Sequence, residues 1–392
     1  MNDDDLTAFR ARARTWLAEA APANGWVHDP AADPEREDPA DRLARARACQ
    51  RALFDAGFAG LTWPSAYGGR GGDNRHQVVF NQEAAAYELP LTPFVIGLGM
   101  CGPTVLAVGT KAQKARYLRP MLVGDELWCQ LFSEPGAGSD VASLQTRAER
   151  REGGWAITGQ KVWTSGAHHC RYGICLVRTD SAAARHRGLT MFVLDLAAPG
   201  VTIRPLRQMT GSARFNEVFL DEVPVGDDDV LGEVGGGWQA AIATLMNERV
   251  SIGAGSPNSY GHDLPVLVDL AREREVTGYG PTRQELASCW IDARIHRLLG
   301  QRVSEAVLAG RQPGPEGSLS KLAGTRLSKR TAAVAVGLAG AGGLAWEDGD
   351  ERRSRLASIL LASPGLSLAG GTDEILRNIV AERLLGLPKE PR

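Results

Sequence analysis

The feature that most constrains the fold of this chain is a change in the spacing of its apolar residues, which occurs twice. Residues 6–125 carry apolar side chains every three to four positions, as in the stripe Leu6, Phe9, Ala13 and Leu17, and this spacing predicts helices. Residues 126–232 instead contain short alternating runs separated by proline and glycine, which are typical of strands. The helical spacing then returns from Trp238 onward.

The order of helix, strand and helix predicts a mostly α, α+β fold with three domains. We expect an N-terminal helical domain at residues 1–125, a small antiparallel β-barrel or sandwich at 126–232, and a C-terminal helical bundle at 233–392. The length of 392 residues, with 43% hydrophobic residues, is sufficient for a sizeable core.

Several elements can be placed within these domains. The pair Gly159–Gln160 lies between two short alternating runs, and it predicts the turn of a tight hairpin. Further strands are expected at 174–177, 189–194, 201–205 and 218–220, and helices at 43–58, 238–255, 283–310, 318–338 and 373–385.

The composition argues against several classes of function. The 44 Lys and Arg residues balance 46 Asp and Glu residues, so no basic surface for nucleic acid is expected. The sequence contains no secretory signal and no apolar run of the roughly 20 residues that span a membrane. The six cysteines lack paired spacing, which indicates a reduced, cytoplasmic protein. No metal site is expected, because the adjacent residues 168–170 (His-His-Cys) cannot easily converge on one ion.

The segment 132–140 has the residues of a ligand-binding loop. Gly136 and Gly138 permit a close approach of the main chain to a ligand, and Ser133 and Ser139 supply hydroxyl groups. On these residues alone, an ordinary polar loop is the favoured interpretation.

Longer motifs make the interpretation specific. The run LFSEPGAGSD at 131–140, the run ITGQKVWTSGA at 157–167 and the ending AGGTDEILRNIVAERLLGLP at 369–388 together resemble the acyl-CoA dehydrogenase family. This resemblance implies FAD as cofactor and an acyl-CoA or acyl-carrier thioester as substrate. It also implies α,β-dehydrogenation as the reaction, with electron-transferring flavoprotein as electron acceptor.

The resemblance assigns roles to the first loop. Phe132 and Ser133 are expected to contact the flavin ring, with Ser133 bonding its pyrimidine edge. Gly138 is expected to belong to the cofactor site, and Ser139 to lie near the flavin phosphate or the thioester arm of the substrate.

It also assigns roles to residues further along the chain. Trp163 is expected to cover the flavin face away from the substrate, because an indole is broad enough for a tricyclic ring. Without the motif, Trp163 would be interpreted as a core residue of the hairpin. Ser165 is expected to bond near flavin N5, and Thr372 to touch the FAD phosphates.

The position of the catalytic base departs from the common family pattern. Most relatives carry a glutamate directly before the Gly-Thr of the last motif, where this chain has Gly370. Glycine cannot abstract a proton, although its N–H can still serve the thioester oxygen. Members resembling isovaleryl-CoA dehydrogenase place the base on an earlier helix in a Glu-Arg pair, which Glu248 and Arg249 match.

Glu248 is therefore the predicted base and Arg249 a predicted substrate-positioning residue. The neighbours of Glu248 on a helix include Thr244 and Leu245, which are apolar enough to desolvate a carboxylate and raise its pKa. The alternative is a surface pair, with the small neighbours serving helix packing. The nearby acids 373–374 are better interpreted as the start of the last helix.

Two motifs with which family members reach a neighbouring subunit's FAD are degenerate in this chain. One reads Arg274-Glu-Val-Thr277-Gly278. The other, Gly337-Leu-Ala-Gly340-Ala-Gly342-Gly343, has Gly337 where relatives have glutamine. We therefore expect either a homo-oligomer or a hetero-oligomer with a related subunit, as occurs among actinobacterial members. A flavin monooxygenase on the same fold and a non-catalytic subunit remain alternatives.

Overall fold

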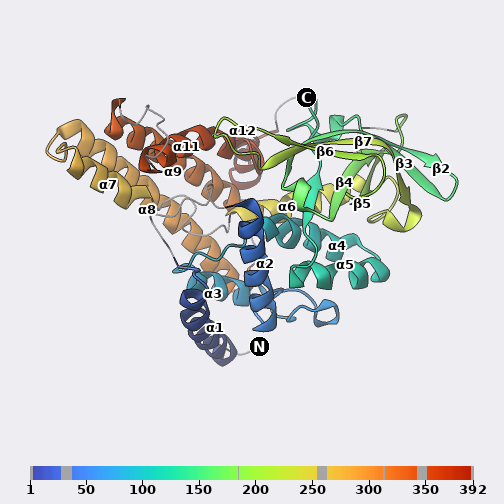
Figure 1. Ribbon diagram of the computed structural model, residues 1–392, viewed down its shortest axis with the longest axis horizontal. Helices are drawn as coiled ribbons and strands as arrows, with labels where there is room; N and C mark the ends of the chain where they lie inside the picture. The colour runs from blue at the N-terminus through green and yellow to red at the C-terminus, as the bar shows by residue number, and fades with distance from the viewer. Residues whose placement is uncertain are drawn as a thin grey trace. The chain divides into compact units, whose positions relative to one another are not determined.

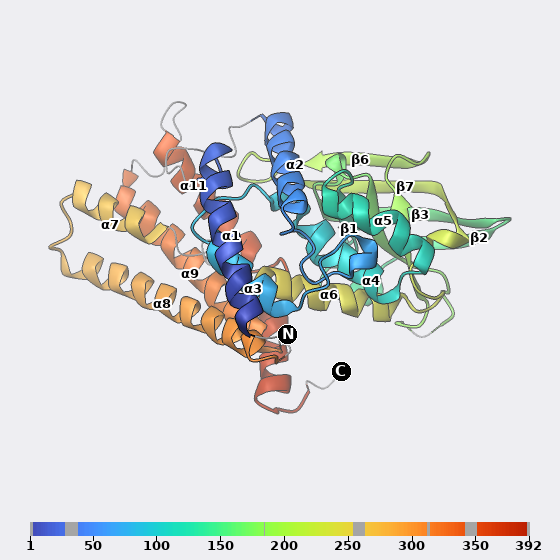
Figure 2. The ribbon, with the colours of Figure 1, turned by 90° about the horizontal axis from the view of Figure 1, so that it is seen from below.

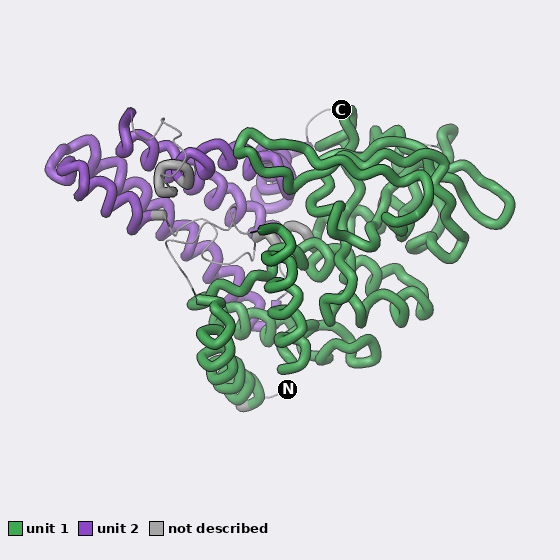
Figure 3. Tube along the Cα trace, in the orientation of Figure 1, with its two compact units in different colours: residues 1–28, 37–251 green, residues 29–36, 252–392 purple. Residues whose placement is uncertain are grey.

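The computed structural model describes residues 3–27, 38–183, 185–253, 263–311, 314–341 and 351–389. The chain forms two compact units, which Figure 3 shows in different colours. Unit 1 comprises residues 1–28 and 37–251, and unit 2 comprises residues 29–36 and 252–392.

Unit 1 contains helices before and after a sheet, as Figures 1 and 2 show. The predicted stripe is confirmed at Phe9, Ala13 and Leu17 of the first helix, which are buried, whereas Leu6 is half-buried. The helices are α1 (Asp3–Ala23), α2 (Pro39–Asp55), α3 (Asn74–Ala84), α4 (Gly102–Val108), α5 (Lys111–Val123) and α6 (Gly237–Gly253).

The sheet of unit 1 has seven strands in the order β1-β4-β2-β3-β7-β6, with β5 paired to β4. The four predicted strands outside the hairpin are present. The strands are β1 (Trp128–Leu131), β2 (Arg147–Arg151), β3 (Gly154–Ser165), β4 (Tyr172–Arg178), β5 (Leu189–Asp195), β6 (Val201–Leu206) and β7 (Phe215–Gly226). Most pairings are antiparallel as expected, but β4 pairs in parallel with both β1 and β2, so the sheet is mixed.

The predicted hairpin turn at Gly159–Gln160 is wrong, because β3 continues through both residues. The tight turn lies earlier, between β2 and β3. Gly159 is required for a close contact instead: a Cβ atom there would lie 2.4 Å from Oγ1 of Thr146.

Two apolar clusters cover the two sides of β4. Ile174 and Leu176 belong to a core that includes residues of α4, α5 and α6, whereas Cys175 and Val177 belong to a core with β3, β5 and β7. This alternation along a strand buried on both faces follows from its two-residue period. The sheet therefore holds α6 on one side and presents the ends of β1 and β3 as fixed positions.

Unit 2 is entirely helical in its described part. Its core includes Leu267, Cys289, Val334 and Leu356. The elements are α7 (Asp263–Glu273), α8 (Gly280–Leu308), α9 (Glu316–Ala339), α11 (Glu351–Leu366), α12 (Asp373–Ile379) and a π-helical turn (Val380–Leu384).

The predicted fold class and the order of the three zones are confirmed. The boundaries at 125/126 and 232/233 stay predictions, and α6 as far as Ser251 falls within unit 1 rather than with the C-terminal helices. In the described residues, every helix is too short or too polar to cross a membrane.

Candidate functional site

The segment that follows β1 is held by three consecutive carbonyl groups. The carbonyl of Phe132 accepts a hydrogen bond from Nζ of Lys161 (3.1 Å), and that of Ser133 accepts one from the N–H of Val162 (2.9 Å). The carbonyl of Glu134 accepts one from the N–H of Ala137 (3.0 Å). The first of the predicted flavin loops is thus attached directly to β3.

Trp163 lies immediately after this attachment in an unusual conformation. Its φ of +59° lies in the left-handed region, which is a true outlier for a bulky residue. The pairing of β3 with β7 shifts register between Lys161 and Thr164, so Trp163 occupies a β-bulge. Its side chain is 59% exposed and meets Phe215 edge-on at 5.8 Å between ring centroids. The alternative of a core tryptophan is therefore wrong.

The end of β3 beyond Trp163 is fixed by side chains of the sheet. Nδ2 of Asn216 donates to the carbonyl of Thr164 (3.0 Å), and Oδ1 of Asn216 lies 2.9 Å from Nδ1 of His168. The N–H of Gly166 donates to the carbonyl of Arg214 (2.8 Å). Ser165 is therefore held on a rigid segment.

The hydrogen-bonding groups at this place suit the edge of a flavin ring. Neither the hydroxyl of Ser133 nor that of Ser165 bonds to another residue in the described part of the chain. Oγ1 of Thr164 is buried and also lacks a hydrogen-bond partner among the described residues. A broad exposed indole beside two unused hydroxyls fits a planar ring with polar atoms at its edge.

The remainder of the first loop is exposed. Gly138 and Ser139 are open to solvent, and a Cβ atom at Gly138 would meet no described neighbour. The next residue, Asp140, forms an ion pair with Arg185, and Nη2 of Arg178 donates to the carbonyl of Ala142 (2.8 Å). These contacts fix the loop, and among the described residues no hydrogen bond joins Ser139 to Ser133.

Helix α6 carries the predicted base and is anchored within unit 1. At its first residue, Gly237, a Cβ atom would lie 2.7 Å from the main chain of Thr190 in β5. Further along, the buried hydroxyl of Thr244 lies 2.9 Å from that of Thr104 in α4. Glu248 and Arg249 lie on α6, but their side chains are outside the described part of the structure.

In unit 2 the last motif forms a turn before α12. Gly370 has a φ of +67°, which favours glycine, and the carbonyl of Gly371 accepts from Nζ of Lys321 (3.0 Å). Oγ1 of Thr372 accepts from the N–H of Ile375 (3.3 Å), so Thr372 is the N-cap of α12. Asp373 contacts the same Lys321 at 3.4 Å.

The comparison with known sequences decides the family. Residues 3–125, 129–223 and 235–385 match, in turn, the descriptions acyl-CoA dehydrogenase N-terminal domain, middle domain and C-terminal domain. The chain belongs to the acyl-CoA dehydrogenase family. It is therefore an oxidoreductase of the acyl-CoA dehydrogenase class.

Named acyl-CoA dehydrogenases resemble most of the chain. Acyl-CoA dehydrogenase FadE34 of Mycobacterium tuberculosis is 42% identical over 87% of this chain, which spans only 46% of that relative. Acyl-CoA dehydrogenase IpdE1 of the same organism is 38% identical over 99% of both chains. Among solved structures, the Tcur3481–Tcur3483 steroid ACAD has a TM-score of 0.81 and 27% identity, covering 100% of this chain and 99% of that chain. The mycobacterial relatives agree with the predicted actinobacterial type.

Two segments of this acyl-CoA dehydrogenase that are degenerate in sequence come together in unit 2. A Cβ atom at Gly340, just beyond α9, would lie 3.1 Å from Nη2 of Arg274, which follows α7. Gly337 lies in the last turn of α9. Residues 342–343 of the same motif are outside the described residues.

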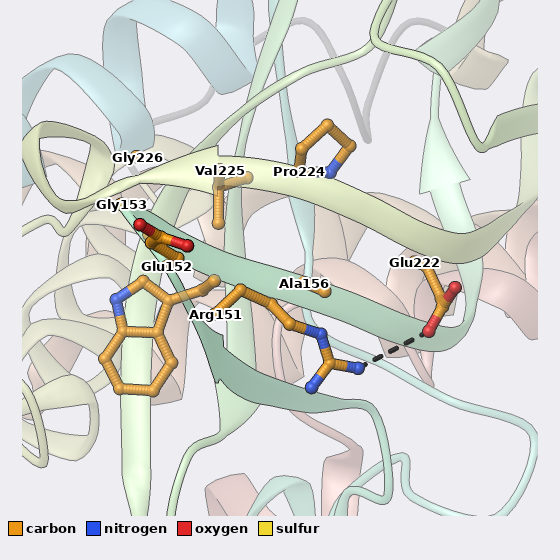
Figure 4. A pocket seen from close by; sticks show the side chains of 10 residues that line it. Arg151, Glu152, Gly153, Ala156, Glu222, Pro224, Val225 and Gly226 are labelled. Atoms are coloured by element: carbon orange, nitrogen blue, oxygen red, sulfur yellow. Dashed lines mark hydrogen bonds and ion pairs between the residues drawn. The ribbon is translucent and has the colours of Figure 1, made fainter.

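Two surface hollows lie on the sheet of this acyl-CoA dehydrogenase. The one in Figure 4, of about 450 Å³, is at the β2–β3 turn, where Arg151 and Glu222 approach to 3.4 Å, and it contains none of the predicted site residues. The other, of about 590 Å³, is lined by Glu134, Gly136 and Gln160 beside the first loop. The sequence did not predict either hollow.

Proposed function

We propose that this acyl-CoA dehydrogenase binds FAD at the ends of β1 and β3 and oxidises the α,β-bond of an acyl thioester. The observation that carries the proposal is Trp163, an exposed indole held at positive φ beside the unused hydroxyls of Ser133 and Ser165. Strained conformations of this kind persist where function requires them. Phe132, Gly138, Ser139 and Thr372 would complete the cofactor site.

When bound, FAD supplies the hydride acceptor for the β-carbon. The carboxylate of Glu248 would accept the α-proton, which is the task of a general base. The N–H of Gly370 would donate to the thioester oxygen as negative charge develops on it. Arg249 would position the substrate or the carboxylate. The anchoring of α6 at Gly237 supports this assignment, because a base must be held in place.

The test of the base compares two acids. Replacing Glu248 with Gln should lower turnover about a hundredfold or more while FAD stays bound. Replacing the exposed Glu374, which contacts Arg377 on α12, with Gln is the matched control and should leave turnover unchanged. An active Glu248→Gln variant would disprove the assignment of the base.

We further propose a bulky, ring-bearing acyl thioester as the substrate. The support is the resemblance to a solved steroid ACAD over the whole chain. The small side chains on α6 do not add support, because Ala241 and Thr244 are buried in the core of unit 1. Anaerobic bleaching of the flavin should be greatest with steroid-like members of an acyl-CoA panel. No bleaching by any member, with an oxygenated product formed once the flavin is reduced by an added reductant and exposed to oxygen, would favour a flavin monooxygenase.

We also propose a related subunit as partner. The Tcur3481–Tcur3483 structure has two named components, and this chain lacks the glutamine at Gly337. A chain expressed alone should hold less than one FAD per subunit, and co-expression with the related subunit should restore full content. Full FAD content in a homo-oligomer would disprove the need for that partner. Full activity of the partner alone would indicate that this chain is a non-catalytic subunit.

A further inference from the structure

Strand β3 contains a charge with no exposure to solvent. The side chain of Lys161 is 0% exposed, and its Nζ donates to the carbonyls of Phe132 (3.1 Å) and Leu176 (2.7 Å) and to Oε1 of Glu134 (2.9 Å). An ammonium group has three N–H donors, so each has one acceptor.

The partner carboxylate is equally well satisfied. Glu134 is 7% exposed, and its Oε1 also accepts from the N–H of Thr146 (2.9 Å). Its Oε2 accepts from the N–H of Gln145 (2.6 Å). The pair therefore ties together the segment after β1, the middle of β4 and the chain just before β2.

Stability alone does not explain a buried pair of this kind. Removing two charges from water costs as much as their attraction returns, and well-packed apolar side chains are often as stable. What distinguishes this pair is its place in the chain. Lys161 fixes the carbonyl before Ser133, its neighbour Val162 fixes the carbonyl of Ser133 itself, and Trp163 follows.

We propose that Lys161, held by Glu134, is a positioning residue that sets the distance between the Phe132–Ser133 segment and Trp163. This inference rests on the proposed function, in which Ser133 meets the flavin edge and Trp163 covers the flavin face. Lys161 then fixes two sides of the cofactor site: the Phe132–Ser133 segment through its ammonium group, and Trp163 through the main chain of β3. Loss of the pair should move the hydroxyl of Ser133 relative to the indole.

The experiment uses Lys161→Met, which keeps a long side chain without the charge. The matched control is Gln50→Met, because Gln50 is 1% exposed and its Nε2 donates to the carbonyl of Leu122 (2.6 Å) on α5. Each variant is prepared in the assembly that holds FAD, with this chain alone or with its related subunit. The measurements are the dissociation constant of FAD, its visible absorption spectrum and the urea midpoint of unfolding.

Lys161→Met should weaken FAD binding about tenfold or more and shift the flavin absorption bands, whereas Gln50→Met should lower only the urea midpoint. Lys161→Met leaves the Glu134 carboxylate buried without its cation, which can prevent folding. The double variant Lys161→Met/Glu134→Gln removes both charges; it should recover the urea midpoint but not the FAD affinity.

The possible failures are distinguishable. Wild-type FAD affinity and absorption in Lys161→Met or in the double variant would overturn the positioning role and leave the proposed function intact. A wild-type protein that holds no FAD, alone or with its related subunit, would overturn the proposed function and this inference with it.

Discussion

The hydroxyl oxygens of Thr104 and Thr244 lie 2.9 Å apart in the buried contact between α4 and α6. Each hydroxyl also lies within bonding distance of a carbonyl one turn back in its own helix, Met100 for Thr104 (2.8 Å) and Ala240 for Thr244 (2.9 Å). Two hydroxyl hydrogens must serve three contacts, so the pair forms one shared network. This network joins the helix that carries Glu248 to the N-terminal helices.

Replacing Thr244 with Val should lower the free energy of unfolding by about 1 kcal/mol, because the shared bond is lost while the shape is kept. The change Thr104→Val should cost less in that background than in the wild type. A double-mutant cycle measured by urea unfolding tests this coupling. Strictly additive effects would show that the two hydroxyls do not interact.

The buried pair of Glu134 and Lys161 predicts a dependence of stability on pH. Burial alone would raise the pKa of Glu134, but the charge of Lys161 and the donated hydrogen bonds outweigh it, and the pKa is lowered. A lowered carboxyl pKa adds stability above the unfolded value of about 4.3, and this stability is lost as the pH falls through the folded value. The stability advantage of wild type over Glu134→Gln should therefore be complete at neutral pH and shrink in acid. An advantage that grows toward acid would contradict the assignment.

Two substitutions at Trp163 separate the effect of its strained backbone on stability from the effect of its indole on FAD binding. At a φ of +59°, Ala should be less stable than Gly by about 1 kcal/mol. Both Trp163→Ala and Trp163→Gly should weaken FAD binding to a similar degree, because both remove the indole. Thermal unfolding of the FAD-free proteins and FAD titration measure the two effects. Undiminished FAD affinity in both variants would exclude the proposed flavin contact.

Replacing glycine with alanine should change the free energy of unfolding in opposite directions at Gly159 and Gly300. Gly159→Ala should destabilise by about 1–3 kcal/mol, because the new Cβ would lie 2.4 Å from Oγ1 of Thr146. Gly300→Ala, in the interior of α8 with open space around it, should stabilise by about 0.5–1 kcal/mol. Denaturant unfolding of the two variants tests the prediction, and destabilisation by Gly300→Ala would refute its second half.

The fold was largely predictable because apolar spacing depends on local sequence. Phe9, Ala13 and Leu17 are buried where the helical period placed them, and the last helix begins at Asp373 as expected. The hairpin turn at Gly159 was wrongly predicted. Glycine is required there because Thr146 packs directly against its main chain, and the local sequence pattern does not encode this contact.

The site was predictable only where a motif named its residues. The motif singled out Trp163, but not its positive φ or its exposure. Lys161 and Glu134 were present in the same motifs and were missed, because their pairing joins positions 27 residues apart. The available signal was a lysine within a run expected to form a strand and a glutamate within the neighbouring loop motif.

The division of the chain into two units near residue 251 affects how the protein can evolve. The flavin-loop motifs retained from the family lie in unit 1, together with α6, whereas the departures at Arg274, Gly337 and Gly370 all lie in unit 2. Each unit has its own core, so substitutions in one need not disturb the packing of the other. After duplication of an ancestral gene, changes confined to the last third of one copy would therefore leave the packing around its flavin loops intact.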